Sequence, residues 1–558
     1  MSLSNPISLS NSMSLSNPIP RHQLIVSLRR RRGLLLMLGY VGLLGLTVLL
    51  AWPTADRLDL TGSPAEARRL TDLFFLTQYV LMALLVPPLA ADAISGERER
   101  NTLEMLLATP LRPAAIVWGK FAAGLTQLAV LVFASLPIVT LCLPLGGIHP
   151  SEAAATYVAM CGSASLFGMV AVAVSAESRR TMSAMVISYM IILPVAASTV
   201  MLYSLSGGPQ AGVAASSRLV MLGLVWPVVC GLVCVGLLLR VRGRLLKPLD
   251  EMPGGGAVGD LGDEDVEAVG MVIRRDRFPD YLFAPPERDE LMADGVNPVH
   301  DKEIRGELFG QGTLMLRLTI QVSMLMALPL MAVCFYLQPA WAGWYTGYVV
   351  LLNLLLAPVF SAGSITGERE RGTLDLLLCT PLSPARILWG KMLAGMRVSF
   401  VLTSFVVWPI VFAWALPPWT YGNDGPAMLG YLAIIALSAV TSSVVATFCS
   451  LVARRTSLAM LGSYTWLGLM YGLPLLARGV AELIAPPLVD RVWAIAPVSP
   501  VATAASLPLW LANRPYEGPE VAGSWFTLAA FLALHAGMCV VLLVVMFRVL
   551  AVRWRVRS

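Results

Sequence analysis

The sequence predicts an all-α polytopic membrane protein with about twelve transmembrane helices, arranged as two six-helix repeats. Three observations predict this class. The chain has 558 residues, of which 57% are hydrophobic and only 13% are charged, unlike a soluble globular domain. It contains many apolar stretches of the roughly 20 residues that a bilayer-spanning helix needs. A 24-residue charged block also occurs twice, each time between long apolar segments.

Twelve apolar stretches account for the predicted spans. Six lie in each half of the chain, and each is close to the length that the hydrocarbon core of a bilayer requires. The predicted spans are residues 34–53, 71–91, 119–143, 153–175, 183–204, 219–239, 314–337, 341–362, 390–415, 427–451, 458–477 and 526–549.

The placement of Lys and Arg predicts the orientation of these helices, because cytoplasmic loops of membrane proteins carry an excess of basic residues. With twelve spans and the N-terminus inside, 24 basic residues fall in the cytoplasm and seven outside. We therefore expect a multi-pass protein of the plasma (inner) membrane with both termini cytoplasmic. The same bias explains the net charge of +6, so nucleic acid is not expected as a partner.

Three anchors indicate that a six-helix unit has been duplicated. The charged block recurs after 271 residues, Asn17-Pro18-Ile19 recurs as Asn-Pro-Val after 280, and Arg179-Arg180-Thr181 recurs after 275. Motifs that recur in one order at nearly constant spacing are the sign of an internal repeat. Since six is an even number, both units enter the membrane the same way round. A pseudo-twofold axis along the membrane normal is expected, with a path between the units.

The repeat predicts four parts of the chain. A tail of residues 1–20, rich in Ser and Asn, is expected to be disordered, and the two six-helix units cover 21–240 and 297–558. Residues 241–296 join them as a flexible acidic cytoplasmic linker, since low hydrophobicity and excess like charge disfavour a folded domain. The alternative for this linker is a regulatory or partner-contacting segment.

The charged block is the main candidate functional feature. Its copies are residues 97–120 (ERERNTLEMLLATPLRPAAIVWGK) and 368–391 (ERERGTLDLLLCTPLSPARILWGK), with 17 of 24 positions identical. Ser95 should cap a helix in which Glu97 and Glu99 occupy the first turn. Leucines at i, i+3 and i+4 then form a narrow apolar stripe. A Thr-Pro pair should end this short amphipathic helix before Pro113 and Pro384 start the next spans.

A stripe of this size is too small for a core, but it could fill a groove on a cytoplasmic partner. The alternative is a helix that rests on its own bundle or on lipid headgroups; the near-identity of the copies favours docking. The residues expected to carry the docking are Glu97, Arg98, Glu99, Arg100, Thr102, Leu103, Leu106, Leu107, Glu368, Arg369, Glu370, Arg371, Thr373, Leu374, Leu377 and Leu378.

The string E-R-E-x-x-T-L-x-x-L-L-x-T-P-L-x-x-x-x-I-x-x-G-K resembles that of type-2 ABC transporter permeases. The Asn-Pro starts and the Arg-Arg-Thr loops are similar to that family as well. The resemblance implies that two permease units are fused in one chain, and that each block contains a coupling helix contacting an ABC ATP-binding subunit. Two copies of that subunit are expected. The implied function is ATP-driven transport across the lipid bilayer, with export favoured and the substrate left open.

The chain lacks an ATPase motif of its own. No G-x-x-x-x-G-K-[S/T] string occurs, and the Gly-Lys pairs at 119–120 and 390–391 are followed by Phe and Met. No catalytic residue and no directly bound cofactor are therefore expected, and ATP and Mg should bind the partner subunit. Cys230 and Cys234 lie four residues apart, but two thiols make a poor metal site. No metal is expected, with copper handling as the minor alternative.

Few ionisable residues lie deep in the predicted spans. His535 is near the middle of the last span, and Arg317 and Arg397 lie a few turns inside theirs. Intramembrane charges are functional candidates by default, so His535 and Arg397 are possible functional residues. The alternatives are that the arginines extend toward the cytoplasm and that the histidine is packed within the bundle.

Two other functions remain open from the residues alone. A secondary transporter of the major facilitator type also has six plus six helices and a charged loop after its second helix. That loop, however, follows a Gly-x-x-x-Asp-Arg-x-Gly-Arg pattern that this chain does not reproduce. A non-transporting membrane scaffold that binds an ATPase is the other alternative.

Overall fold

The protein is described here from a computed structural model. It covers residues 31–51, 64–100, 102–108, 113–142, 149–178, 181–205, 219–245, 297–306, 324–325, 327–337, 341–415, 424–484, 489, 493–508 and 525–557. The regular structure in these ranges is helical and contains no strand, which confirms the all-α class. The predicted tail and residues 246–296 of the predicted linker lie outside the described ranges.

Eight helices in the described part are long and apolar enough to cross a membrane, which confirms a multi-pass membrane protein. The count of twelve is not confirmed: at the first, fifth and seventh predicted spans, the described residues contain shorter apolar helical stretches, Met37–Leu50, Ala184–Val200 and Ala327–Tyr336. The eleventh lies in a helix whose middle carries Gly, Ser, Tyr, Thr and Trp, which lower its hydropathy. The eight are Leu70–Glu99, Ala115–Thr140, Pro150–Glu177, Met221–Gly243, Ala342–Glu370, Pro384–Ala415, Gly425–Val452 and Trp525–Val552.

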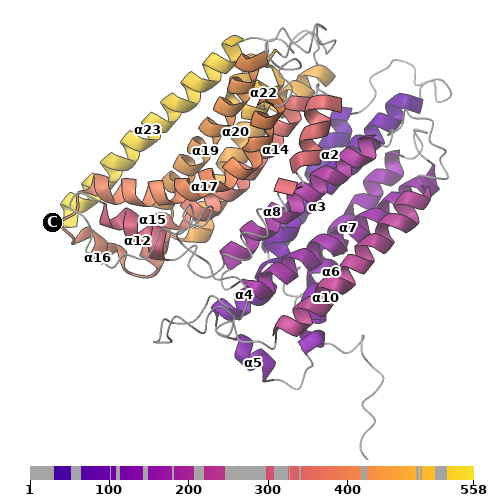
Figure 1. The fold of residues 1–558 in the computed structure, drawn as a ribbon, viewed down its shortest axis with the longest axis horizontal. Coiled ribbons are helices and arrows are strands. Elements are labelled where there is room, and N and C mark those ends of the chain that lie inside the picture. Colours follow the sequence, from indigo (N-terminus) through magenta and orange to yellow (C-terminus); the bar gives the residue numbers. More distant parts are fainter. Residues whose placement is uncertain are drawn as a thin grey trace, which may run out of the picture. The chain divides into compact units, whose positions relative to one another are not determined.

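The chain forms two compact units, one of residues 1–188 and 202–251, the other of residues 189–201 and 252–558. In the first, α7 packs against α3, α6 and α10 (Figure 1). Aromatic and aliphatic side chains, including Tyr40 and Phe74, form its core between α2, α3, α6 and α7. Its elements are α2 (Arg31–Ala51), α3 (Pro64–Ala90), α4 (Asp92–Glu99), α5 (Leu103–Leu107), α6 (Pro113–Cys142), α7 (Pro150–Glu177), α8 (Thr181–Leu205), η2 (Met221–Val225) and α10 (Trp226–Leu245).

In the second unit, α19 packs against α14, α17, α20 and α23 (Figure 1). Most of its small side chains are buried, which lets membrane helices approach closely. Residues Tyr189–Met201 of α8 also belong to this unit. Its other elements are α12 (Pro298–Gly306), η5 (Ala332–Leu337), α14 (Ala342–Ser361), α15 (Gly363–Glu370), α16 (Leu374–Leu378), α17 (Pro384–Ala415), α19 (Gly425–Val452), α20 (Thr456–Ile484), η9 (Ala496–Val498), α22 (Pro500–Ala505) and α23 (Trp525–Arg557).

The second unit also contains a buried segment between α20 and α23. The Ser499 side chain caps α22 by accepting a hydrogen bond from the Ala502 amide. Its hydroxyl also donates to the Tyr471 carbonyl at 2.6 Å, and Ser499 and Thr503 are fully buried. Backbone away from water needs such partners, so this segment is held by the protein itself.

Candidate functional site

Each charged block begins in the last turn of an eight-residue helix, α4 or α15, and continues through a five-residue helix, α5 or α16. In the first block α4 ends at Glu99 and α5 follows from Leu103. The prediction that Ser95 caps this helix is wrong, because Ser95 lies inside α4 and its hydroxyl donates to the Ala91 carbonyl at 2.8 Å. Glu97 and Glu99 therefore lie in the last turn of α4 rather than in the first turn of a helix. The predicted helix starts at Pro113 and Pro384 are confirmed.

The acidic side chain that opens the first block faces the chain itself. Glu97 Oε1 lies 2.5 Å from the Lys120 ammonium nitrogen, and Glu97 Oε2 accepts a hydrogen bond of 2.5 Å from the Thr102 hydroxyl. Lys120 is buried, so its charge depends on this carboxylate for compensation. The pair joins the end of α4 to α6 across 23 residues of sequence.

The next two residues of the block hold α4 to the loop between α7 and α8. Arg98 Nη1 donates to the Ser178 carbonyl at 2.5 Å. Glu99 accepts hydrogen bonds from the Thr181 amide at 2.8 Å and from the Thr181 hydroxyl at 3.0 Å. The Arg-Arg-Thr motif, predicted as a separate anchor of the repeat, thus supplies its threonine to the block.

The second block makes the same contacts. Glu368 Oε1 lies 3.0 Å from the Lys391 ammonium, and Glu368 accepts a hydrogen bond from the Thr373 hydroxyl. Arg369 donates to the carbonyls of Ala453 and Leu451, and Glu370 accepts from the amide and hydroxyl of Thr456 at 2.8 and 2.9 Å. We call these two sets of contacts the clamps. The first consists of Glu97, Arg98, Glu99, Thr102 and Lys120, and the second of Glu368, Arg369, Glu370, Thr373 and Lys391.

The leucines of the short helices after the clamps are not their most exposed side chains, and the docking role of these leucines stays a prediction. Leu103, Leu106, Leu107, Leu374 and Leu377 are only half-buried. The most exposed apolar side chains are instead Met105, at 74% exposure, and Leu376, at 71%. Each follows an exposed carboxylate, Glu104 or Asp375. We call Glu104–Met105 and Asp375–Leu376 the outward pairs.

The sequence analysis did not single out the outward pairs, because it followed the spacing of the leucines. A helix of five residues has no fixed outer side until its neighbours are known. The available signal was the substitution pattern: between the copies Glu becomes Asp and Met becomes Leu, so charge and apolar character are kept. Arg100 and Arg371 are exposed as well, and the Leu378 side chain lies outside the described residues.

The two intramembrane candidates, His535 and Arg397, are not members of the clamps. His535 is fully buried in α23, with Nε2 at 3.2 Å from the Val498 carbonyl and Nδ1 at 3.3 Å from the Thr441 hydroxyl. Both ring nitrogens are therefore used within the protein, which favours the packing interpretation. Arg397 is half-buried on α17, and Arg317 lies outside the described residues.

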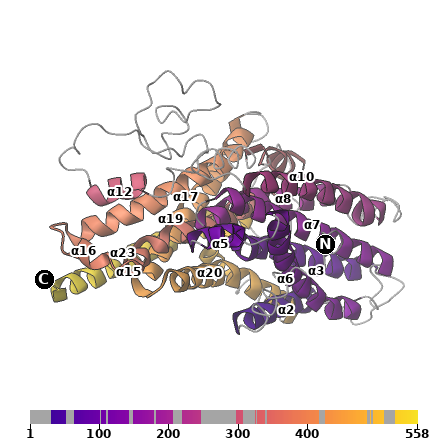
Figure 2. The same ribbon diagram turned by 90° about the horizontal axis from the view of Figure 1, so that it is seen from below.

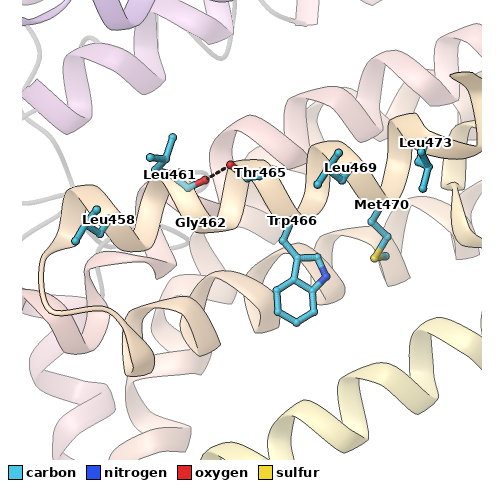
Figure 3. Close-up of a pocket in the computed structure, with 8 residues that line it drawn as sticks. All are labelled: Leu458, Leu461, Gly462, Thr465, Trp466, Leu469, Met470 and Leu473. Atoms are coloured by element: carbon cyan, nitrogen blue, oxygen red, sulfur yellow. Dashed lines mark hydrogen bonds between the residues drawn. The ribbon is translucent and has the colours of Figure 1, made fainter. Parts of the chain in front are cut away.

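One face of α20 is exposed and apolar (Figure 3). Its polar hydroxyl, that of Thr465, donates to the Leu461 carbonyl in the same helix at 2.8 Å, so contact with lipid leaves it satisfied. The face consists of Leu458, Leu461, Gly462, Thr465, Trp466, Leu469, Met470 and Leu473. Among the residues that the structure describes, no group of three or more His, Cys, Asp or Glu side chains could hold a metal ion.

Comparison with known proteins agrees with this architecture. The family model described as ABC-2 family transporter protein matches residues 19–233 and 281–552. The match covers most of the chain and both halves of the repeat. No curated protein matches the chain. The two matched regions, the repeated clamps and the membrane-spanning helices lead to one identification. The chain belongs to the ABC-2 family of transporter proteins, with two permease units fused in a single polypeptide.

Proposed function

We propose that this chain is the membrane-spanning permease of an ATP-driven ABC exporter that works with separate ATP-binding subunits. Twelve spans, six per unit, cross the plasma (inner) membrane with both termini in the cytoplasm. ATP and Mg bind the partner subunits, two copies of which dock on the chain, one at each block. The blocks thus act as coupling helices, and the permease performs no chemistry itself.

The observation that carries this proposal is that each outward pair follows directly after a clamp. An exposed residue without a binding role does not need a rigidly held backbone before it. Here a large apolar side chain stands exposed on a five-residue helix whose preceding residues are held by an ion pair and several hydrogen bonds. Exposed apolar groups on a rigid support are typical of docking sites.

The clamps also explain how a push on α5 or α16 would move the bundles. Through Lys120 the first block is joined to α6, and through Arg98 and Glu99 to the ends of α7 and α8. The second block is joined in the same way to α17, α19 and α20. Motion of the ATP-binding subunits would therefore reach three membrane helices in each unit at once.

The outward pairs indicate the chemistry of the partner surface. Met and Leu have similar volumes, and burying either is worth about 1.5–3 kcal/mol. The neighbouring carboxylate would favour basic side chains at the rim of the partner's binding groove. Such a charge pair fixes the register of docking and adds less to the affinity. Because both copies keep the same two chemical features, two identical ATP-binding subunits fit them.

Substitution of the outward pairs tests this proposal. The chain is co-expressed with its ATP-binding subunit, and the tagged permease is purified as wild type and as the double variant Met105→Asp/Leu376→Asp. We expect the variant to lose most of the copurifying ATPase, because two apolar contacts worth about 3–6 kcal/mol together are replaced by charges. The control is Val552→Asp, which adds one carboxylate at an exposed apolar residue at the end of the α23 span; it is compared with each single variant, Met105→Asp and Leu376→Asp.

Each other result has a definite meaning. Unchanged copurification of the ATPase with the double variant would refute docking at the outward pairs. A complex that hydrolyses ATP but moves no substrate would favour the scaffold function. Transport by the purified chain alone, driven by a proton gradient, would refute ATP-driven transport.

A further inference from the structure

In the second unit the block also contacts the short helix α12, which precedes the membrane helices of that unit in the sequence. Asn297 caps α12, since its Oδ1 accepts a hydrogen bond from the Val299 amide at 3.1 Å. The Nδ2 of the same side chain donates to the Arg386 carbonyl at 2.7 Å. The start of α12 is thereby fixed to the first turn of α17, and the two helices lie side by side (Figure 2).

The contact between α12 and α17 is unusually close at the Gly-Lys pair of the block. A Cβ atom added to Gly390 would lie 2.9 Å from Val299 Cβ and 3.0 Å from the His300 amide nitrogen. A side chain at residue 390 would therefore push α12 away. The His300 Nδ1 lies 3.4 Å from the Gly390 carbonyl and adds a polar contact at the same place.

A charge from α12 completes the second clamp. The Lys391 ammonium lies 2.5 Å from Glu303 Oε1 on α12 and 3.0 Å from Glu368 Oε1 on α15. Its side chain is only 3% exposed, and a buried ammonium needs such partners. Lys302 lies 3.8 Å from the same Glu368 oxygen. Lys391 therefore bridges α12 to the block.

The sequence of the first unit has no carboxylate at the position that corresponds to Glu303. At the spacing of 280 residues that relates the Asn-Pro motifs, Gln23 corresponds to Glu303, and a neutral amide supplies no carboxylate. Lys120 forms its ion pair with Glu97, and it is further attracted by Asp92 on the adjacent α4. The residue of the second unit that corresponds to Asp92 is Gly363. The ion pair that Glu303 of α12 forms with Lys391 thus has no counterpart at the matching position of the first unit.

We propose that Glu303 is a positioning residue that fastens the second block to α12 through Lys391, so that the two blocks transmit motion unequally. This inference rests on the proposed function, because the motion to be transmitted is that of the ATP-binding subunits. A push on α16 has to carry α12 with it as well as α17, α19 and α20. Residues 1–30 contain no Asp or Glu, so the segment of the first unit that corresponds to α12 offers no carboxylate to resist a push on α5. The second block is the more firmly held of the two.

Amide hydrogen exchange of the full chain in lipid nanodiscs tests this inference. Glu303→Gln keeps the shape of the side chain and removes its charge. We expect amide exchange of the segment 363–378 to become about tenfold faster, because the loss of one charge-assisted contact makes local opening easier. Exchange of the matching segment 92–107 should stay unchanged. Glu303→Asp, which keeps the charge on a shorter side chain, should restore part of the protection.

The matched control is Gln23→Glu, which introduces a carboxylate at the corresponding position of the first unit. It should leave exchange of 363–378 at the wild-type rate. Equal acceleration of both segments by Glu303→Gln would indicate general destabilisation and overturn the inference, as would no change in either. None of these readouts requires the ATPase. Failure of the ATPase to copurify with the wild-type permease would therefore refute the proposed function separately.

Discussion

The two units are more similar to each other in their charged blocks than in the interiors of their helix bundles. In the blocks, the contacts of one unit recur in the other almost atom for atom. In the interiors, some buried polar groups occupy different places. The Gln78 amide of the first unit donates to the Ser135 hydroxyl at 2.9 Å, and that hydroxyl lies 3.0 Å from the Tyr157 hydroxyl. The residues 271 positions later are Val349 and Val406.

The second unit has a polar contact of its own in place of this one. The Thr403 hydroxyl donates to Asn353 Oδ1 at 2.5 Å between α14 and α17, and the corresponding residues of the first unit are Met82 and Val132. Packing in a membrane tolerates such exchanges, because it depends mainly on volume and on satisfied polar groups. The blocks have retained both residues and geometry, as expected if both meet the same kind of partner.

The largest effect is expected from reversing a charge in either clamp. Glu97→Lys would place a cation against the buried Lys120, and Glu368→Lys would do the same at Lys391. Breaking a buried ion pair costs about 3–5 kcal/mol, so we expect ATPase activity of the purified complex to fall at least tenfold in each variant. The neutral variants Glu97→Gln and Glu368→Gln should lose less. Full activity in both reversed variants would contradict a mechanical role for the clamps.

The blocks could be predicted from the sequence because the same string occurs twice, and a repeat can be recognised without knowing the tertiary structure. It could not show that Glu97 pairs with Lys120, since residues 23 positions apart meet only when α6 turns back on α4. The same limit explains the wrong cap at Ser95. A serine followed by glutamates satisfies the local rule for a helix start, yet α4 continues through it and uses its hydroxyl inside the helix.

Identifying the outward pairs and counting the spans also required knowledge of how the helices pack. Leu103, Leu106 and Leu107 have the spacing of a docking stripe, but they lie half-buried, and Met105 between them is the exposed side chain. The span of residues 458–477 was predicted from length and overall apolarity. Gly462, Tyr464 and Tyr471 weaken that signal, while packing of α20 on α19 supports the helix in the structure.

A smaller effect is expected from the interiors, and it should appear in stability rather than in coupling. Gln78→Leu and Asn353→Leu each remove one buried hydrogen bond, with a cost of about 0.6–1.7 kcal/mol in a membrane bundle. Thermal unfolding in detergent should register both losses, while the ATPase activity of the complex stays within about twofold of wild type. A tenfold loss of activity in either variant would show that these polar contacts belong to the transport mechanism.

The smallest effect is expected where the blocks themselves differ. Gly372, between α15 and α16, has a backbone φ of 70°, in the left-handed region that glycine adopts freely and asparagine tolerates best among other residues. The residue at this place in the first block is Asn101. We therefore expect Gly372→Asn to change the unfolding free energy by less than about 0.5 kcal/mol, and the β-branched Gly372→Val to cost about 1–2 kcal/mol. Thermal unfolding of the two variants measures this difference. Equal destabilisation by Asn and Val would mean that the two blocks do not share a turn at this position.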